Sequence, residues 1–224
     1  TTVPSFAAIA STNNQIEIRR VCNGDGCDNS PSTQYSWTVV DNPAIPTASK
    51  SPNILSVCEG QTLTLTGVTD NGGGTGTCNI EYRHSTDGGS TYTSWSTTPS
   101  SFSAVTGDNR IQIRKTCTGE GCDDSDVSTF SWTVVDDPAL PTATKSPDVA
   151  EVCNGHTLTL INPIDYGGGT GTCVFEYRHS TNNGSEWSDW STTVSSISAV
   201  SGTNNRIEIR KVCAGYDCDN SDAT

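Results

Sequence analysis

The stretch "SWTVVDDPALPTA" at residues 131–143 is a near-identical copy of "SWTVVDNPAIPTA" at residues 36–48. Each copy begins with alternating apolar and polar residues, the pattern of a strand with one buried face. Each copy ends in Asp-Pro or Asn-Pro followed by Leu-Pro or Ile-Pro, which interrupts regular structure and indicates a linker. A strand and a linker that occur twice predict a chain of repeated domains.

Other segments recur with the same spacing. "VCEGQTLTL" at residues 57–65 returns as "VCNGHTLTL" at residues 152–160, 95 positions later. A further segment occurs three times, as "IEIRRVCNGDGCDNS", "IQIRKTCTGEGCDDS" and "IEIRKVCAGYDCDNS". Cys117 and Cys213 are 96 positions apart, which places a one-residue insertion near Asn204 and Asn205. The chain is therefore a tandem array of units of about 95 residues.

The linkers define the boundaries of these units. Residues 45–139 form a complete β-sandwich repeat, residues 1–44 are the C-terminal part of a preceding repeat, and residues 140–224 are a following repeat that lacks its last strand. We expect the array to extend beyond both ends of this chain. Because repeated units contact mainly their neighbours, the array predicts a rod and not a single pocket.

The fold class follows from the strands expected in one unit. Leu63 and Leu65 alternate with threonines in "TLTLT", and the same period occurs in "RIQIR" and "FSWTV". About seven such strands in about 95 residues predict an all-β, immunoglobulin-like or fibronectin-III-like sandwich.

Composition and charge restrict the function. The chain has ten cysteines, no methionine and a net charge of −13. Cysteines in a Thr- and Gly-rich chain of short strands indicate disulfides and an extracellular location. The negative charge argues against nucleic acid as a partner. No signal peptide is visible, and no apolar run predicts insertion into a membrane.

The repeated pattern "VCxGxTLTL … GC … VVDxPxxPT" resembles the immunoglobulin-like repeats of giant cell-surface adhesins of Bacteroidetes, of the gliding-motility SprB type. The resemblance implies type IX secretion, attachment at the outer membrane, and a role as structural stalk repeats in cell adhesion and gliding motility. It implies neighbouring repeats as partners, and an adhesion target such as surface polysaccharide. This chain carries four cysteines per unit, whereas the simpler repeats of that class carry two.

Two disulfide schemes fit the sequence. In the first, Cys78 pairs with Cys117 and Cys173 with Cys213, because the third and sixth strands of such a sandwich are antiparallel neighbours. In the second, pairing is local: Cys58–Cys78, Cys117–Cys122 and Cys22–Cys27. Topology also brings Cys58 near Cys218 of the next unit. The disulfide candidates are Cys22, Cys27, Cys58, Cys78, Cys117, Cys122, Cys153, Cys173, Cys213 and Cys218.

Two turns have the Asp-box pattern of sialidase hairpins, "STDGGSTY" at residues 85–92 and "STNNGSEW" at residues 180–187. A sialidase also needs converging arginines and a catalytic carboxylate. The arginines recur in each unit, and Asn182 replaces Asp87. The histidines that precede each turn, His84 and His179, are expected in the core or at its rim. We therefore predict no enzyme activity and no catalytic residues.

Aromatic residues beside these hairpins support an alternative function. Rings at a surface can stack on sugars, so a carbohydrate-binding β-sandwich module is the second hypothesis, although packing against the sandwich is favoured. The candidate glycan contacts are Tyr92, Trp95, Trp187 and Trp190.

Acidic residues recur in the loop after the sixth strand and in the linkers. If these loops meet at the unit junctions, their oxygens could bind Ca²⁺, which takes six to eight oxygen ligands. Ordinary Asp and Asn turns are the simpler explanation. No other cofactor is expected. The candidate calcium ligands are Asp41, Asp123, Asp124, Asp136, Asp137, Asp217, Asp219 and Asp222.

Overall fold

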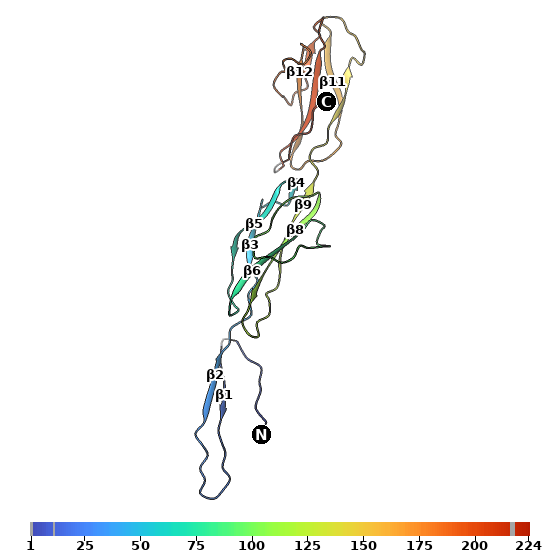
Figure 1. Ribbon diagram of the computed structural model, residues 1–224. Helices are drawn as coiled ribbons and strands as arrows, with labels where there is room; N and C mark the ends of the chain where they lie inside the picture. The colour runs from blue at the N-terminus through green and yellow to red at the C-terminus, as the bar shows by residue number, and fades with distance from the viewer. Residues whose placement is uncertain (1, 11, 216–217) are drawn as a thin grey trace.

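The computed structural model describes residues 2–10, 12–215 and 218–224, and these residues form strands and no helix. Three units follow one another end to end, so that the molecule is a rod with its termini far apart (Figure 1). The predicted all-β fold is confirmed.

The first unit is represented by one hairpin. Strands β1 (Asn13–Ile18) and β2 (Thr33–Thr38) pair antiparallel, with Asn14 opposite Trp37 and Ile16 opposite Tyr35. Trp37 is 51% exposed and Tyr35 is 50% exposed. No second sheet covers this hairpin within the described chain.

The middle unit is a closed sandwich of two sheets. Strands β3 (Thr47–Ser51), β5 (Thr62–Thr69) and β7 (Ser101–Ser103) form one sheet in the order β3-β5-β7. Strands β4 (Ser56–Cys58), β9 (Ser128–Val135), β8 (Gly107–Cys117) and β6 (Cys78–Ser85) form the other in the order β4-β9-β8-β6. β4 and β9 are parallel, and the other neighbours are antiparallel. This is the predicted immunoglobulin-like arrangement.

The core of the middle unit lies between these sheets. Leu63 on β5, Ile111 and Ile113 on β8, and Val57 on β4 are fully buried. Trp132 on β9 is 1% exposed, and its indole N–H donates to the carbonyl of Pro52 at 2.9 Å. Buried positions alternate along β8 and β9, as the sequence period requires.

A buried asparagine closes the turn before β8. Asn109 is completely buried, accepts from the backbone N–H of Val105 at 3.2 Å and donates to its carbonyl at 2.6 Å. Asn14 and Asn205 make the same two contacts with Ile9 and Val200. Each asparagine satisfies backbone groups that the turn leaves unpaired, within two residues of the start of the strand in all three units.

The third unit has the same two layers with fewer strands. Strands β10 (Thr142–Ser146), β11 (Thr157–Ile164) and β13 (Ser196–Ser198) form one sheet, and β12 (Cys173–Ser180) pairs with β14 (Arg206–Cys213) in the other. Counterparts of β4 and β9 do not occur among its described residues. As a consequence Val152 is 37% exposed, whereas Val57 at the same position of the middle unit is fully buried.

Candidate functional site: the junction between units

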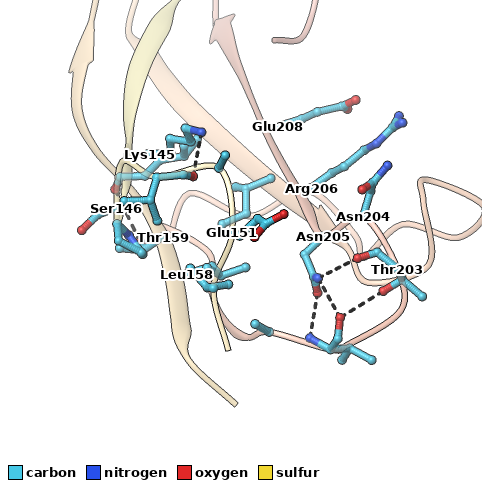
Figure 2. A pocket seen from close by; sticks show the side chains of 18 of the residues that line it. Lys145, Ser146, Glu151, Leu158, Thr159, Thr203, Asn204, Asn205, Arg206 and Glu208 are labelled. Carbon is cyan, nitrogen blue, oxygen red and sulfur yellow. Dashed lines mark hydrogen bonds between the residues drawn. The ribbon is translucent and has the colours of Figure 1, made fainter. Parts of the chain in front are cut away.

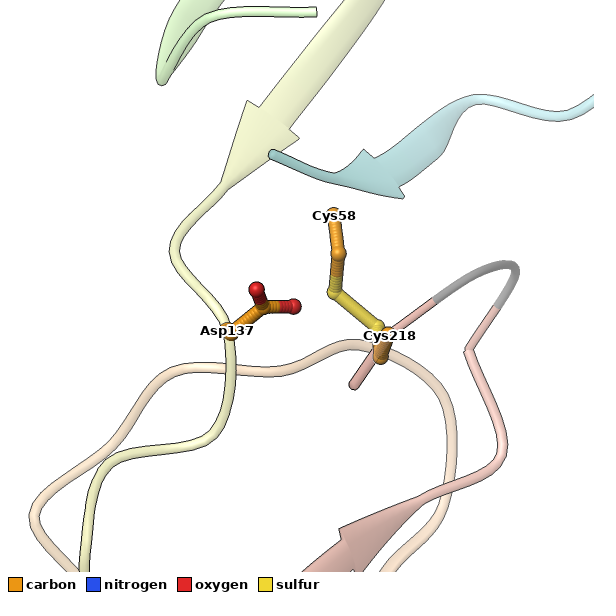
Figure 3. A group of neighbouring side chains, drawn as sticks. All are labelled: Cys58, Asp137 and Cys218. Carbon is orange, nitrogen blue, oxygen red and sulfur yellow. A yellow bond between two sulfur atoms is a disulfide. The ribbon is translucent and has the colours of Figure 1, made fainter. Parts of the chain in front are cut away.

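A disulfide bond connects the middle unit to the third unit. It joins Cys58, fully buried at the end of β4, to Cys218 in the loop after β14, with their Cα atoms 5.0 Å apart (Figure 3). The two residues are 160 positions apart in sequence. The linker after β9 and this bond therefore connect the same two units at one junction.

The other two disulfides lie within units. Cys78 bonds to Cys117 and Cys173 to Cys213, with Cα separations of 4.1 and 4.0 Å. In both units the bonded residues lie directly opposite each other on neighbouring antiparallel strands.

The local pairing scheme is not the one adopted. It required Cys58–Cys78 and Cys117–Cys122, but Cys58 lies beside Val135, at the end of the sheet opposite Cys117. The third local pair, Cys22 and Cys27, consists of free thiols that interact: a hydrogen bond with Cys27 lowers the pKa of Cys22, and the same contact raises the pKa of Cys27. Free cysteines in the described chain are Cys22, Cys27, Cys122 and Cys153.

Backbone hydrogen bonds fasten each linker to the unit that follows it. The N–H of Gly169 donates to the carbonyl of Asp136 at 2.7 Å, and the N–H of Ala139 donates to Gly167 at 3.0 Å. Gly74 bonds to Asp41 at 2.7 Å in the same way before the middle unit. A Cβ atom on Gly168 would collide with the carbonyl of Asp137. This close approach explains the recurring "GGGTG" loop.

The acidic residues at the junctions have individual partners. The N–H of Asp219 donates to the carboxylate of Asp137 at 3.2 Å, and the N–H of Asp123 donates to the side-chain oxygen of Asn42 at 3.3 Å. Asp124 forms an ion pair with Arg114 at 2.7 Å. Linker and loop therefore meet at both junctions, through side chain to backbone contacts.

The calcium hypothesis stays a prediction. Asp136 accepts a hydrogen bond from Thr106 at 2.6 Å, and Asp217 lies outside the described residues. Among the described residues, one group has metal-ligand spacing: Cys58, Asp137 and Cys218. Its two sulfurs bond to each other and so are not free thiolates. Melting temperature measured with and without EDTA tests whether Ca²⁺ binds through Asp41, Asp222 or the other predicted ligands.

The aromatic residues beside the hairpins stack with arginines. In the middle unit Arg83 lies over Tyr92 at 4.4 Å and over Trp95 at 4.3 Å, and Arg114 lies over Trp95 at 4.5 Å. Glu81 accepts from Arg114 at 2.8 Å, and Gln112 accepts from Arg83 at 2.8 Å.

The third unit repeats this aromatic–arginine stack. Arg178 contacts Trp187 and Trp190 at 4.6 and 4.5 Å, and Arg210 contacts Trp190 at 4.2 Å. Two arginines therefore stack on Trp95 and two on Trp190, on ring faces that a sugar would need. The arrangement favours packing of these rings over glycan binding.

The Asp-box turns are held by their own hydrogen bonds. The Asp87 carboxylate accepts from the hydroxyl of Ser85 at 2.7 Å, and from the N–H and hydroxyl of Thr91 at 2.9 and 2.6 Å. These donors, led by the Thr91 hydroxyl, lower the pKa of Asp87 far below its ordinary value. Asn182 makes the equivalent contacts with Ser180 and Glu186. The side chain of Asp87, or of Asn182 in the third unit, therefore stabilises the turn.

His84 is part of the packing between the sheets. Its ring stacks on Phe102 with centroids 4.2 Å apart, and burial lowers its pKa. Arg83 and Arg114 meet on the ring of Trp95, and Arg110 forms an ion pair with Asp108 at 3.8 Å.

Sequence reasoning missed a buried lysine contact that occurs in both the middle and the third unit. The ammonium group of Lys115 lies 2.7 Å from Asp70 and donates to the carbonyls of Gly72 and Gly73 at 3.2 and 3.0 Å. Lys211 repeats the contact with Asp165 at 2.7 Å. The signal was a lysine in register with the buried isoleucines of "RIQIRK" and "RIEIRK".

Comparison with known proteins yields structural neighbours only. No family model matches the chain, and no curated protein matches it. A crystal structure of titin domains matches with a TM-score of 0.39 and 13% identity, covering 95% of this chain and 74% of that one. A crystal structure of chicken contactin domains FN1–FN3 matches with a TM-score of 0.34 and 10% identity, covering 88% and 67%. The described residues include no helix long and apolar enough to cross a membrane.

Proposed function

We propose that these units are load-bearing stalk segments of a secreted, disulfide-stabilised cell-surface adhesin. The observation that carries the proposal is the bond between Cys58 and Cys218, which joins one sandwich to the next. Disulfides of this number in sandwich units are typical of extracellular proteins. The resemblance to Bacteroidetes adhesin repeats supports the finer part of the proposal: type IX secretion, outer-membrane attachment and gliding motility.

The bond changes how tension passes through the chain. When the two ends are pulled apart, force passes from Cys58 directly to Cys218 and bypasses the residues between them. The residues between Cys58 and Cys218 are therefore spared the load that would unfold them, and the bond itself carries it. Such a bypass is a mechanical role, and it needs neither a bound ligand nor a reaction.

Pulling on the two ends of the single molecule tests the proposal. The bridge encloses 160 positions, of which 39 and 40 stay closed by the two bonds within units. Replacing Cys58 and Cys218 by serine should therefore release about 80 residues, or about 270 Å at 3.3–3.6 Å per residue.

Cys27→Ser is the matched control, because Cys27 is exposed and free. It should leave the extension of the oxidised chain unchanged. If the unsubstituted oxidised chain already extends by the larger amount at low force, the load-bearing role is excluded. Protease accessibility on intact cells that produce the protein tests the surface location separately.

A further inference from the structure

The junction between the middle and third units brings together three side chains that carry metal-binding atoms. The sulfurs of Cys58 and Cys218 and a carboxylate oxygen of Asp137 all lie within 4.8 Å of one another (Figure 3). Cys58 and Asp137 belong to the end of the middle unit, and Cys218 belongs to the third unit. Reduction of the bond between the cysteines would leave two thiols beside a carboxylate, and a thiolate is a strong metal ligand.

Contacts other than the disulfide also hold these side chains at the junction. Cys58 ends β4, beside the end of β9 that leads into the linker and Asp137. The carboxylate of Asp137 accepts from the N–H of Asp219, in the loop of the third unit, at 3.2 Å. Hydrogen bonds of this kind orient a ligating carboxylate. The N–H of Gly169 donates to the carbonyl of Asp136 at 2.7 Å, so the linker keeps its tie to the third unit when the bond is reduced.

The spacing of the three side chains fits a tetrahedral metal ion. Zn²⁺ binds a thiolate sulfur at about 2.3 Å, so two sulfurs on one tetrahedral ion lie about 3.8 Å apart. This separation is shorter than the 4.8 Å that encloses the three ligand atoms. The Cα atoms of Cys58 and Cys218 are 5.0 Å apart, so rotation about the Cα–Cβ bonds can bring the sulfurs to this separation.

The charge around the group favours a divalent cation, and the sulfurs select its kind. The hydroxyl of Thr106 lies 3.3 Å from the carboxylate of Glu59 and 2.6 Å from that of Asp136. These two acidic residues are the sequence neighbours of Cys58 and Asp137, and their charge attracts cations to the junction. Two thiolates select Zn²⁺ over Ca²⁺ or Mg²⁺, which prefer oxygen ligands.

A groove of about 1330 Å³ in the third unit offers different chemistry (Figure 2). Its side chains include the carboxylates of Glu151 and Glu208 and the cations Lys145 and Arg206. The described residues that line it include neither cysteine nor histidine. The ligands that Zn²⁺ prefers are therefore at the junction and not in this groove.

We propose that Cys58, Cys218 and Asp137 bind Zn²⁺ when the disulfide is reduced, so that the metal ion replaces the bond as the tie between the units. The protein supplies three ligands, and the fourth tetrahedral position is left for water. The ion and the disulfide exclude each other, because both need the same two sulfurs. The junction then stays closed in oxidising and in reducing surroundings.

A phosphine reductant supplies the two thiolates. It attacks the sulfur of Cys218, which is less buried than Cys58, and displaces the Cys58 thiolate. Water then attacks phosphorus and releases the second thiol, and the phosphine leaves as its oxide. The sulfurs gain two electrons from phosphorus, and water supplies the two protons and the oxygen. Zn²⁺ then replaces the two thiol protons, which pass to the solvent.

Alkylation of the reduced full chain measures this binding at single cysteines. The chain is reduced with tris(2-carboxyethyl)phosphine and treated with iodoacetamide, with and without Zn²⁺ and with citrate as a weak competing chelator. Peptide mapping should show that Zn²⁺ slows alkylation of Cys218 at least about tenfold. Cys78 and Cys117 belong to no three-ligand group of the described chain and should react at an unchanged rate. Ca²⁺ should protect none of these cysteines.

Two variants of the linker separate a metal site from a general effect of charge. Asp137→Asn should abolish the protection of Cys218, because one ligand is lost. The substitution suits the fold, since Asn42 has the same position in the preceding linker and accepts from the N–H of Asp123 at 3.3 Å. Asp136→Asn is the matched control, because it removes a neighbouring charge outside the ligand group and should keep the protection.

A further variant tests the site without reduction. Cys218→His leaves the disulfides within the units intact and offers Zn²⁺ a thiolate, an imidazole and Asp137. Zn²⁺ should raise its melting temperature, and should not do so when Asp137→Asn is added. If circular dichroism shows that the reduced chain has lost its strands, this variant decides the question.

Three results would overturn the proposal. They are a folded, reduced chain in which Cys218 reacts equally fast with and without Zn²⁺, protection that is unchanged in Asp137→Asn, and, where the reduced chain unfolds, a Cys218→His variant that Zn²⁺ does not stabilise. Each is distinct from failure of the stalk proposal, which is tested by pulling on the oxidised chain.

Discussion

At the scale of single residues, Lys115 on β8 holds the glycine loop against the sheet, and this loop in turn binds the linker. Its side chain is 4% exposed, and its ammonium group has three partners: Asp70 and the carbonyls of Gly72 and Gly73. Lys115→Met approximately keeps the length of the side chain and removes the ammonium N–H donors. We expect the free energy of unfolding to fall by about 1–3 kcal/mol, because Asp70 and two backbone carbonyls lose a charged donor.

Urea denaturation measures this loss. Asp70→Asn is the matched control, since Asp70 is half exposed and Lys115 would keep both carbonyls. The control should cost less than Lys115→Met. Equal stability of Lys115→Met and the unsubstituted chain would mean that water replaces the ammonium group without cost.

Asp87 should make the first Asp-box turn sensitive to acid. Its hydrogen bonds, first of all those from Thr91, lower its pKa in the folded state. Because the pKa of Asp87 is lower in the folded than in the unfolded protein, its ionised carboxylate stabilises the turn at pH values above the unfolded pKa of about 3.9. This contribution is lost as the pH falls towards the folded pKa. Hydrogen exchange of the Thr91 amide should therefore speed up in strong acid.

Asp87→Asn is the corresponding test variant, because Asn182 already makes the same turn in the third unit without a titrating group. The variant should keep the turn, and the protection of the Thr91 amide relative to its intrinsic exchange rate should no longer fall in strong acid. An amide that exchanges with the same pH dependence in both proteins would contradict this explanation.

At the scale of strands, the two tryptophans of the "SWTVVD" strands differ in what covers them. Trp132→Ala should lower the free energy of unfolding of the middle unit by about 3–5 kcal/mol, because it leaves a cavity and unpairs the Pro52 carbonyl. Trp37→Ala should change the monomer little, since Trp37 is half exposed. Chemical denaturation of dilute, monomeric protein measures both, and a similar loss in the two variants would refute the assigned packing.

The aromatic–arginine stack should stabilise the hairpin of the middle unit. Trp95→Ala removes two cation–π contacts, each worth about 0.5–2 kcal/mol, so we expect a loss of about 1–4 kcal/mol in thermal or urea unfolding. Adding soluble glycans to the unsubstituted protein should leave tryptophan fluorescence unchanged. Saturable quenching that disappears in Trp95→Ala would favour the carbohydrate-binding hypothesis instead.

The alternation of apolar and polar residues along the strands predicted more of this structure than the spacing of the cysteines did. The period of two placed Leu63, Ile111 and Trp132 in one core, since alternation fixes which face each side chain occupies. Cysteine spacing left two schemes open, and the register of β6 against β8 decides between them by placing Cys78 opposite Cys117. The stack was missed because its arginines come from separate strands, and only the pairing of these strands brings them to one ring.

At the scale of the whole molecule, the junction between the middle and third units combines a short linker with contacts from both neighbouring units. Asp136 bonds to Gly169 of the following unit and to Thr106 of the preceding one. The disulfide adds a second covalent connection, and two connections between the same bodies restrict both bending and twisting. The rod in Figure 1 is thus built from local contacts that recur with the sequence repeat.

Removing the inter-unit bond should therefore loosen the joint and leave the units folded. In Cys58→Ser, the third unit keeps the Cys173–Cys213 bond and the middle unit keeps the Cys78–Cys117 bond, so each sandwich retains its internal disulfide. Small-angle X-ray scattering of dilute, monomeric protein should show a broader distribution of interatomic distances and a smaller mean end-to-end length.

Unfolding should change as well. The loop-entropy relation gives about 5 kcal/mol for a bridge that spans 160 residues, so Cys58→Ser should unfold at lower denaturant concentration, and its two sandwiches should unfold independently. Cys27→Ser has no bond to lose and should match the unsubstituted chain in scattering and in denaturation. If Cys58→Ser remains as straight as the oxidised chain, the backbone ties of Asp136 and Ala139 alone hold the joint, and the disulfide serves only to resist force.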